Sequence, residues 1–130
     1  SISIPVTARG ISESFWVVTG TTRDGEISGD IALAAQSSAT VVILMGLNRI
    51  NDIMEQFKAQ GKSETPVAII QNGTLPDQKS VIGKVDTIGG LAAAAGISSP
   101  AVIVIGEVVN LAQQLEEVTS QAVIQFQYGT

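Results

Sequence analysis

The sequence contains no cysteine and no histidine in its 130 residues, and only 5 of its side chains are aromatic. The absence of cysteine excludes disulfide bonds, thiolate metal ligands and a cysteine nucleophile. The absence of histidine excludes a Ser-His-Asp triad and the usual imidazole-based zinc sites. We therefore predict no metal site in this chain.

Basic side chains are also scarce: 7 Lys and Arg stand against 12 Asp and Glu, which gives a formal charge of −5. This balance argues against a nucleic acid or an anionic membrane surface as partner, because clustered Lys and Arg bind both. The apolar runs fall far short of the roughly 18 residues needed to span a membrane. No signal peptide is visible, so we expect a soluble, cytoplasmic domain. Because the sequence opens at Ser1 without Met, we interpret it as the middle of a longer chain.

Ile and Val together supply 30 residues and Ala supplies 14, so the interior is β-branched rather than aromatic. This mixture favours buried strands covered by Ala-rich helices. Three continuous apolar runs end on glycine and predict strands that are buried on both faces: residues 40–46, 66–73 and 100–106. Residues 15–22 have high β propensity and predict a further strand, and residues 80–85 predict a weaker one.

Four segments carry the apolar spacing of an amphipathic helix: residues 30–36, 50–57, 88–95 and 108–115. We expect Asn48 to cap the second helix, and Gly61 and Gly96 to follow the second and third. Every apolar stripe is interpreted as core packing. The last segment, residues 121–128, alternates polar and apolar side chains, which predicts an edge strand or a segment that pairs with another chain.

These elements predict one α/β domain over residues 1–117 and a tail over residues 118–130. The expected architecture is a two-layer α/β domain, with a sheet of about five strands and three or four helices packed on one side of it. Neither composition nor spacing indicates the order of the strands.

In alternating α/β proteins, ligands bind beyond the carboxyl ends of the strands, and three segments follow strands here: residues 45–46, 72–74 and 106–107. Glycine at such a place lets the backbone approach a ligand, although Asn-Gly is also a common turn. Met45 either offers a soft, polarisable surface to a planar ligand or fills a gap in the core. Arg9 either grips a carboxylate or lies solvated in a loop. No P-loop, dinucleotide fingerprint or nucleophile elbow is present.

Five motifs occur in an order that resembles a known family: residues 4–10 (IPVTARG), 18–20 (VTG), 44–47 (LMGL), 66–74 (PVAIIQNGT) with Pro76 and Gln78, and 99–109 (SPAVIVIGEVV). The set resembles the carboxyl-terminal half of the uroporphyrinogen-III C-methyltransferases, which belong to the tetrapyrrole methylases. The resemblance extends over residues 4–115, and it implies a sheet that is not purely parallel.

The resemblance implies a two-domain, homodimeric enzyme that uses S-adenosyl-L-methionine to methylate uroporphyrinogen III at C-2 and C-7. The product, precorrin-2, leads to sirohaem and cobalamin. Cofactor and substrate lie between the two domains in this family. Met45 and Gly73 match positions that line the cofactor pocket, and Asn72 and Thr74 flank the second of them. Arg9 is the candidate for binding a substrate carboxylate.

Two departures from the family pattern limit what can be carried over. Ala8 stands where the family usually has histidine, and the amino-terminal half, which carries the residues assigned to catalysis, is missing from the 130 residues. We therefore assign no catalytic residue and expect the fragment alone to be inactive. Two alternatives remain open: a non-enzymatic dimerisation or ligand-binding module, and the corresponding domain of a cobalt-precorrin methyltransferase.

Overall fold

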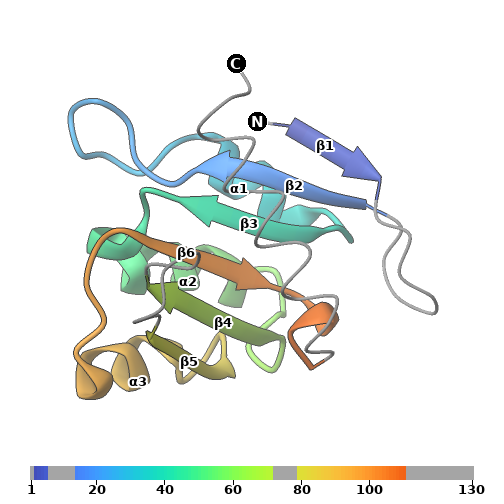
Figure 1. Ribbon diagram of the computed structural model, residues 1–130. Coiled ribbons are helices and arrows are strands. Elements are labelled where there is room, and N and C mark those ends of the chain that lie inside the picture. The colour runs from blue at the N-terminus through green and yellow to red at the C-terminus, as the bar shows by residue number, and fades with distance from the viewer. Residues whose placement is uncertain (1, 6–13, 72–78, 111–130) are drawn as a thin grey trace.

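The computed structural model describes residues 2–5, 14–71 and 79–110. These residues form one six-stranded sheet in the order β1-β2-β3-β6-β4-β5 (Figure 1). The strands are β1 Ile2–Pro5, β2 Ser14–Thr19, β3 Thr40–Leu44, β4 Pro66–Gln71, β5 Lys79–Lys84 and β6 Ala101–Ile105.

The sheet is mixed, as the family resemblance implies. Strands β2 and β3 are parallel, whereas β6 is antiparallel to both of its neighbours, β3 and β4. Strands β1 and β5 close the two edges in antiparallel pairs. The predicted α/β class is confirmed, with one strand more than expected because β1 pairs with β2. Pro5 is compatible with this strand because an edge strand leaves one row of backbone groups unpaired.

The helices α1 (Asp30–Gln36), α2 (Ile50–Lys58) and α3 (Ile88–Ala95) form the second layer behind the sheet (Figure 1). All three bury apolar side chains in one core cluster with the same face of the sheet. Its largest fully buried members are Ile31, Ile43, Ile53, Phe57, Ile69, Ile88 and Ile103. The prediction that the helices pack on one side is therefore confirmed.

The opposite face of the sheet is apolar and buried as well. Its cluster combines residues of β2, β3, β4 and β6 with Val108 and Val109 of the 3-10 helix η2 (Glu107–Asn110). All five residues of β3 are buried, from Thr40 to Leu44. The central strands are therefore continuous apolar runs because both of their faces avoid water.

Several element boundaries differ from the predicted ones. Asn48 lies inside a 3-10 turn, η1 (Leu47–Arg49), so α2 begins at Ile50 without a side-chain cap. Leu91 is 39% exposed, so the apolar stripe of α3 is only partly core. The helix predicted from residue 108 begins as η2, and its remainder, like the tail over 118–130 and the boundary at 117, lies outside the described residues.

Candidate functional site

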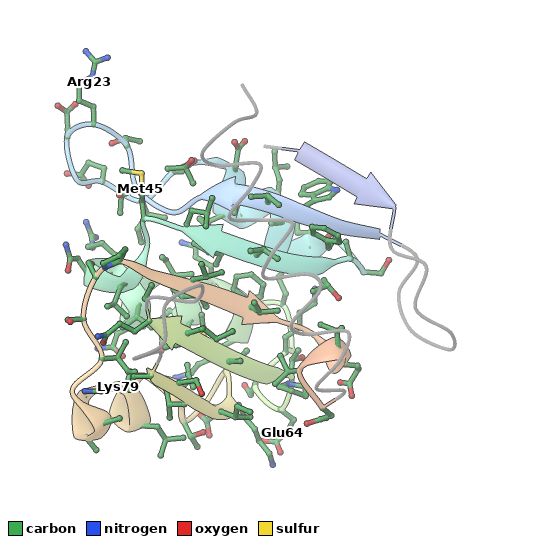
Figure 2. All side chains as sticks on the ribbon, in the orientation of Figure 1. Arg23, Met45, Glu64 and Lys79 are labelled. Atoms are coloured by element: carbon green, nitrogen blue, oxygen red, sulfur yellow. The ribbon has the colours of Figure 1, made fainter. Side chains whose placement is uncertain are left out.

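The carboxyl ends of β2, β3 and β4 meet at one edge of the sheet. Thr19 pairs with Leu44 across the parallel pair, and Gln71 pairs with Ala101 and with Lys79, which start their strands at this same edge. Figure 2 shows Met45 and Lys79 on this side of the molecule and Glu64 on the other. The candidate site comprises the loops that follow β2, β3 and β4 at this end of the sheet. We call this end of the sheet, with its loops, the carboxyl edge.

Only one of the three predicted strand-end segments is described at the carboxyl edge. Residues 45–46 follow β3 there. Residues 106–107 lie at the opposite edge, because β6 is antiparallel and the Gly106 N–H donates to the Pro66 carbonyl at 2.9 Å. Residues 106–107 therefore follow a strand as predicted, but they do not line the carboxyl edge. Asn72, Gly73, Thr74 and Arg9 lie outside the described residues, so their roles stay predictions.

Two glycines bring the ends of β2 and β3 into close contact. A Cβ built on Gly20 would lie 2.6 Å from the Gly46 Cα, and one built on Gly46 would lie 2.7 Å from the Ile43 Cγ2. The Gly20 N–H also donates to the Leu44 carbonyl at 2.6 Å. Real Cβ atoms do not approach this closely, so a methyl group at Gly20 would press on the backbone and one at Gly46 would displace the buried Ile43 side chain. The backbone that follows β2 and the backbone that follows β3 are therefore in direct contact beyond the ends of the two strands.

Met45, which directly precedes Gly46, has an unusual backbone and an exposed side chain. Its φ is +56°, which makes it the one non-glycine residue with positive φ in the described ranges. The side chain is 57% exposed, so Met45 does not fill a gap in the core. A non-glycine residue in this left-handed region costs roughly 1–2 kcal/mol. Strained backbone of this kind is concentrated at functional sites, where surrounding contacts maintain it.

The loop between β2 and α1, residues 20–29, extends outward beyond the carboxyl end of β2 (Figure 1). It is a small hairpin in which Thr21 bridges Ile27 and the Thr22 N–H donates to the Glu26 carbonyl at 2.7 Å. Gly25 makes the turn with φ +81°, and exposed Arg23 stands at the tip (Figure 2). The Thr21 hydroxyl donates to the Met45 carbonyl oxygen at 2.8 Å.

Arg49 holds this hairpin from the side of α2. Its Nη1 donates to the Gly25 carbonyl at 2.9 Å, and its Nε donates to the Asp52 carboxylate at 2.9 Å. Glu26 lies 4.0 Å from the same guanidinium. Neither Thr21 nor Arg49 is among the candidates predicted from the sequence. The Val-Thr-Gly-Thr segment that ends β2 was the available signal for Thr21.

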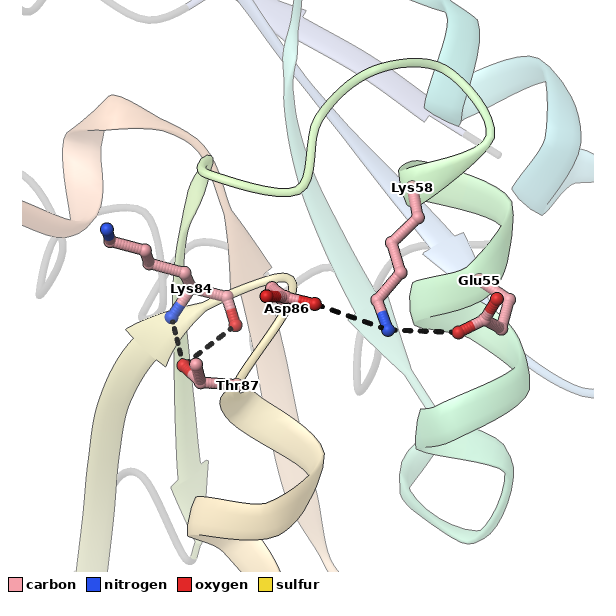
Figure 3. Close-up of polar contacts among 5 residues, drawn as sticks. All are labelled: Glu55, Lys58, Lys84, Asp86 and Thr87. Carbon is pink, nitrogen blue, oxygen red and sulfur yellow. Dashed lines mark hydrogen bonds and ion pairs between the residues drawn. The ribbon is translucent and has the colours of Figure 1, made fainter.

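The lysines with perturbed pKa values lie at the opposite edge of the sheet. A hydrogen bond to Glu55 raises the pKa of Lys58, whose Nζ also lies 3.6 Å from Asp86 (Figure 3). A hydrogen bond to Glu64 raises the pKa of Lys84, and burial lowers the pKa of Lys62. Lys58 thereby links α2 to the turn after β5, and Lys84 links the end of β5 to the loop before β4.

Within the described ranges, no three carboxylates gather into a group that could hold a metal ion. No helix in the same ranges has both the length and the apolarity needed to cross a bilayer. The carboxyl edge presents backbone groups, the Met45 thioether and threonine hydroxyls, together with the charged side chains of the hairpin and Arg49. These groups can bind and orient an organic ligand.

The fold is an α/β domain with a mixed sheet, and its loops beyond the carboxyl ends of β2, β3 and β4 form one candidate ligand site. A family model described as "Tetrapyrrole (Corrin/Porphyrin) Methylases" matches residues 1–89. The siroheme synthase of Methylobacillus flagellatus is 38% identical over 113 residues, which are 86% of this chain and 24% of that protein. The chain thus spans about a quarter of the length of the curated relatives it matches.

Comparison with solved structures also finds methyltransferases that act on tetrapyrroles. The uroporphyrin-III C-methyl transferase of Thermus thermophilus, complexed with S-adenyl homocysteine, superposes with a TM-score of 0.69 at 25% identity, covering 83% of this chain and 48% of that one. A cobalt precorrin-4 methyltransferase gives 0.69 over 82% and 45%, but at 19% identity it shares the fold alone. The chain belongs to the tetrapyrrole methylase family.

Proposed function

We propose that this chain is the carboxyl-terminal part of an S-adenosyl-L-methionine-dependent methyltransferase that converts uroporphyrinogen III to precorrin-2. Within it, the carboxyl edge forms one wall of the cofactor site. The observation that carries this proposal is Met45, exposed and held at φ +56° where β3 ends. The Thermus thermophilus neighbour supports it, because that protein was solved with S-adenyl homocysteine.

The residues of the edge fit such a cofactor. An exposed thioether is a polarisable, apolar surface for a flat heterocycle. The adjacent Gly46 has no Cβ between its backbone and a ligand. We expect Asn72, Gly73 and Thr74 to complete this wall, since they follow β4, whose carboxyl end lies at the same edge.

The bound cofactor supplies an activated methyl group on a sulfonium. What remains for the protein is to hold that group in line with the accepting carbon and to keep both partners still. Met45 and its neighbours serve this positioning, and we propose Arg9 as a contact for a substrate carboxylate. We assign no catalytic residue to this chain and expect the catalytic residues in the remainder of the protein.

The first test is Met45→Ala in the complete protein, with the dissociation constant of S-adenosylhomocysteine measured by calorimetry. We expect binding to weaken about tenfold, equal to about 1.4 kcal/mol. The matched control is Leu33→Ala, because Leu33 is equally exposed at 57% but lies on α1. Equal affinities of wild type and Met45→Ala would remove Met45 from the site.

The second test is Gly73→Val, again in the complete protein. We expect a branched side chain at this position to block the approach of the cofactor and to abolish methylation while the protein stays folded. Circular dichroism checks the fold, and calorimetry measures the affinity. A folded variant with unchanged cofactor affinity would exclude Gly73 from the site.

The substrate is tested by offering the complete protein uroporphyrinogen III and cobalt-precorrins separately, and detecting methyl transfer by mass spectrometry. Two methylations of uroporphyrinogen III are the expected result. Turnover of a cobalt-precorrin alone would assign the chain to a later step. No cofactor binding and no turnover at all would favour the non-enzymatic module. Sedimentation of the same sample tests the proposed homodimer.

A further inference from the structure

The hydroxyl of Thr21 is placed to control the backbone of Met45. It donates to the Met45 carbonyl oxygen at 2.8 Å, although the two residues are 24 positions apart in the sequence. We propose that Thr21 is a positioning residue of the cofactor site, which fixes the Met45–Gly46 peptide and thereby the direction of the Met45 side chain. This inference rests on the proposed function, in which Met45 contacts the cofactor.

The Met45–Gly46 peptide needs such a restraint. Met45 occupies the left-handed region at φ +56°, which disfavours a residue with a Cβ. Gly46 follows it, and glycine offers little steric resistance to a rotation of the peptide plane. Rotation of this plane would turn the Met45 carbonyl away and change the backbone from which the side chain projects. A donor on the carbonyl oxygen opposes that rotation directly.

Thr21 can serve as this restraint because its own backbone is held on both sides. Before it, the Gly20 N–H donates to the Leu44 carbonyl at 2.6 Å. The Gly20 carbonyl also accepts a hydrogen bond from the Ser28 N–H at 2.9 Å. Thr21 itself forms an antiparallel β-bridge with Ile27. Arg49 anchors the far end of the hairpin through the Gly25 carbonyl at 2.9 Å. The hydroxyl is therefore presented from a braced loop.

A neighbouring residue provides a natural comparison. Thr22 lies on the same hairpin and is exposed. Its side chain makes no hydrogen bond to any residue in the described ranges, whereas its backbone N–H donates to the Glu26 carbonyl. Both positions hold threonine, so the residue type does not explain the difference between Thr21 and Thr22. The distinguishing feature is the bond from its hydroxyl to the strained residue.

The experiment compares Thr21→Val, Thr21→Ser and Thr22→Val in the complete protein. Valine keeps the shape of threonine and removes the donor, whereas serine keeps the donor. We expect Thr21→Val to raise the dissociation constant of S-adenosylhomocysteine roughly three- to tenfold, the range for one lost hydrogen bond. The KM for S-adenosyl-L-methionine should rise likewise, with kcat at saturation changed less than about twofold. Thr21→Ser and Thr22→Val should match wild type.

Unchanged cofactor affinity in Thr21→Val overturns the inference, as does a loss in Thr21→Ser equal to that in Thr21→Val. If Thr21→Val fails to fold, the Thr21→Ser variant provides the test instead. The inference is supported if Thr21→Ser has the cofactor affinity and the melting temperature of the wild type. Met45→Ala, measured in parallel, separates the two proposals. Weakened binding in Met45→Ala with none in Thr21→Val leaves the proposed function standing, whereas no effect of Met45→Ala removes both.

Discussion

The glycines of this chain differ in how much space surrounds a methyl group added by substitution with alanine. At Gly20, an added Cβ would press on the Gly46 backbone at 2.6 Å, and backbone cannot move aside as a flexible side chain can. At Gly90, inside α3, an added Cβ has nothing within 4 Å. The same substitution should therefore have opposite effects on stability at these two positions.

We predict that Gly20→Ala lowers the free energy of unfolding by about 1–3 kcal/mol, the usual cost of forcing extra volume into a packed place. Gly90→Ala should raise it by about 0.5–1 kcal/mol, because alanine restricts the unfolded chain and favours helix. Urea denaturation of both variants measures the difference. Equal stability of Gly20→Ala and wild type would contradict the close contact of β2 and β3.

Two lysines should titrate on opposite sides of their ordinary value. The hydrogen bond from Lys58 to Glu55 raises its pKa above 10.5, while burial of Lys62 lowers its pKa below 10.5. Lys58 therefore contributes stability that is complete below pH 10.5 and is lost as pH rises through its folded pKa. The folded chain loses the Lys62 proton before the unfolded chain does, so at Lys62 stability rises as pH approaches 10.5.

Titration of the lysine side chains by carbon NMR checks this order: Lys62 should lose its proton at lower pH than Lys58. Lys62 owes its partial burial to two neighbours, since its Nζ donates to the Ser37 carbonyl at 2.5 Å and lies 5.9 Å from the centre of the Phe57 ring. A higher pKa for Lys62 than for Lys58 would show that this lysine is not desolvated.

Among the elements, the hairpin over residues 20–29 depends most on polar contacts. The helices are held by apolar burial, with Phe57 and Ile53 fully enclosed between α2 and the sheet. The hairpin contributes only Ile27, partly buried, to the core. Its position beyond the carboxyl end of β2 rests instead on backbone bonds and on Arg49.

We predict that Arg49→Gln loosens this hairpin without unfolding the domain. The Gly25 N–H, which donates to the Thr22 carbonyl at 3.0 Å, should exchange with solvent faster. The melting temperature should change little, because an exposed ion pair contributes about 0–1 kcal/mol. Hydrogen exchange measured by NMR tests this.

Lys84→Gln is the matched control, since it breaks an exposed ion pair to Glu64 of 2.7 Å at the opposite edge. It should leave exchange at Gly25 unchanged. Unaltered exchange in Arg49→Gln as well would mean that the guanidinium does not restrain the loop.

At the scale of the whole molecule, we propose that this chain forms one wall of a larger site. The chain covers 48% of the Thermus thermophilus neighbour and 24% of the siroheme synthase it resembles. The described part of the carboxyl edge offers a thioether, hydroxyls, backbone groups and the charged side chains of the hairpin and Arg49, and we assign chemistry on the substrate to none of them. Binding energy for cofactor and substrate should therefore be shared with other parts of the protein.

We predict that the isolated chain binds S-adenosylhomocysteine at least about a hundredfold more weakly than the complete protein, a difference of about 2.7 kcal/mol or more. It should show no methyl transfer to uroporphyrinogen III. Calorimetry and mass spectrometry, with both proteins at equal concentration, measure these quantities. Tight binding or turnover by the isolated chain would show that the site is complete within it.

The elements of this fold follow from local patterns. Helices α1 and α3 lie where apolar spacing predicts them, and β3, β4 and β6 coincide with the continuous apolar runs, because burial on two faces leaves a direct mark in each strand. The family resemblance adds the mixed character of the sheet. Met45 is also conspicuous from the sequence, as a flexible residue in a β-branched run, but its part in a cofactor site stays a prediction.

Strand direction leaves no such mark, because a strand buried on both faces has the same apolar run whether its neighbours are parallel or antiparallel. Only the pairing of β6 with β3 and β4 shows that Gly106 lies at the far edge. The bond from Thr21 to Met45 joins residues 24 positions apart, and the strain at Met45 arises where two glycines let strand ends meet. These features depend on long-range packing, so the arrangement of the site emerges only in the folded molecule.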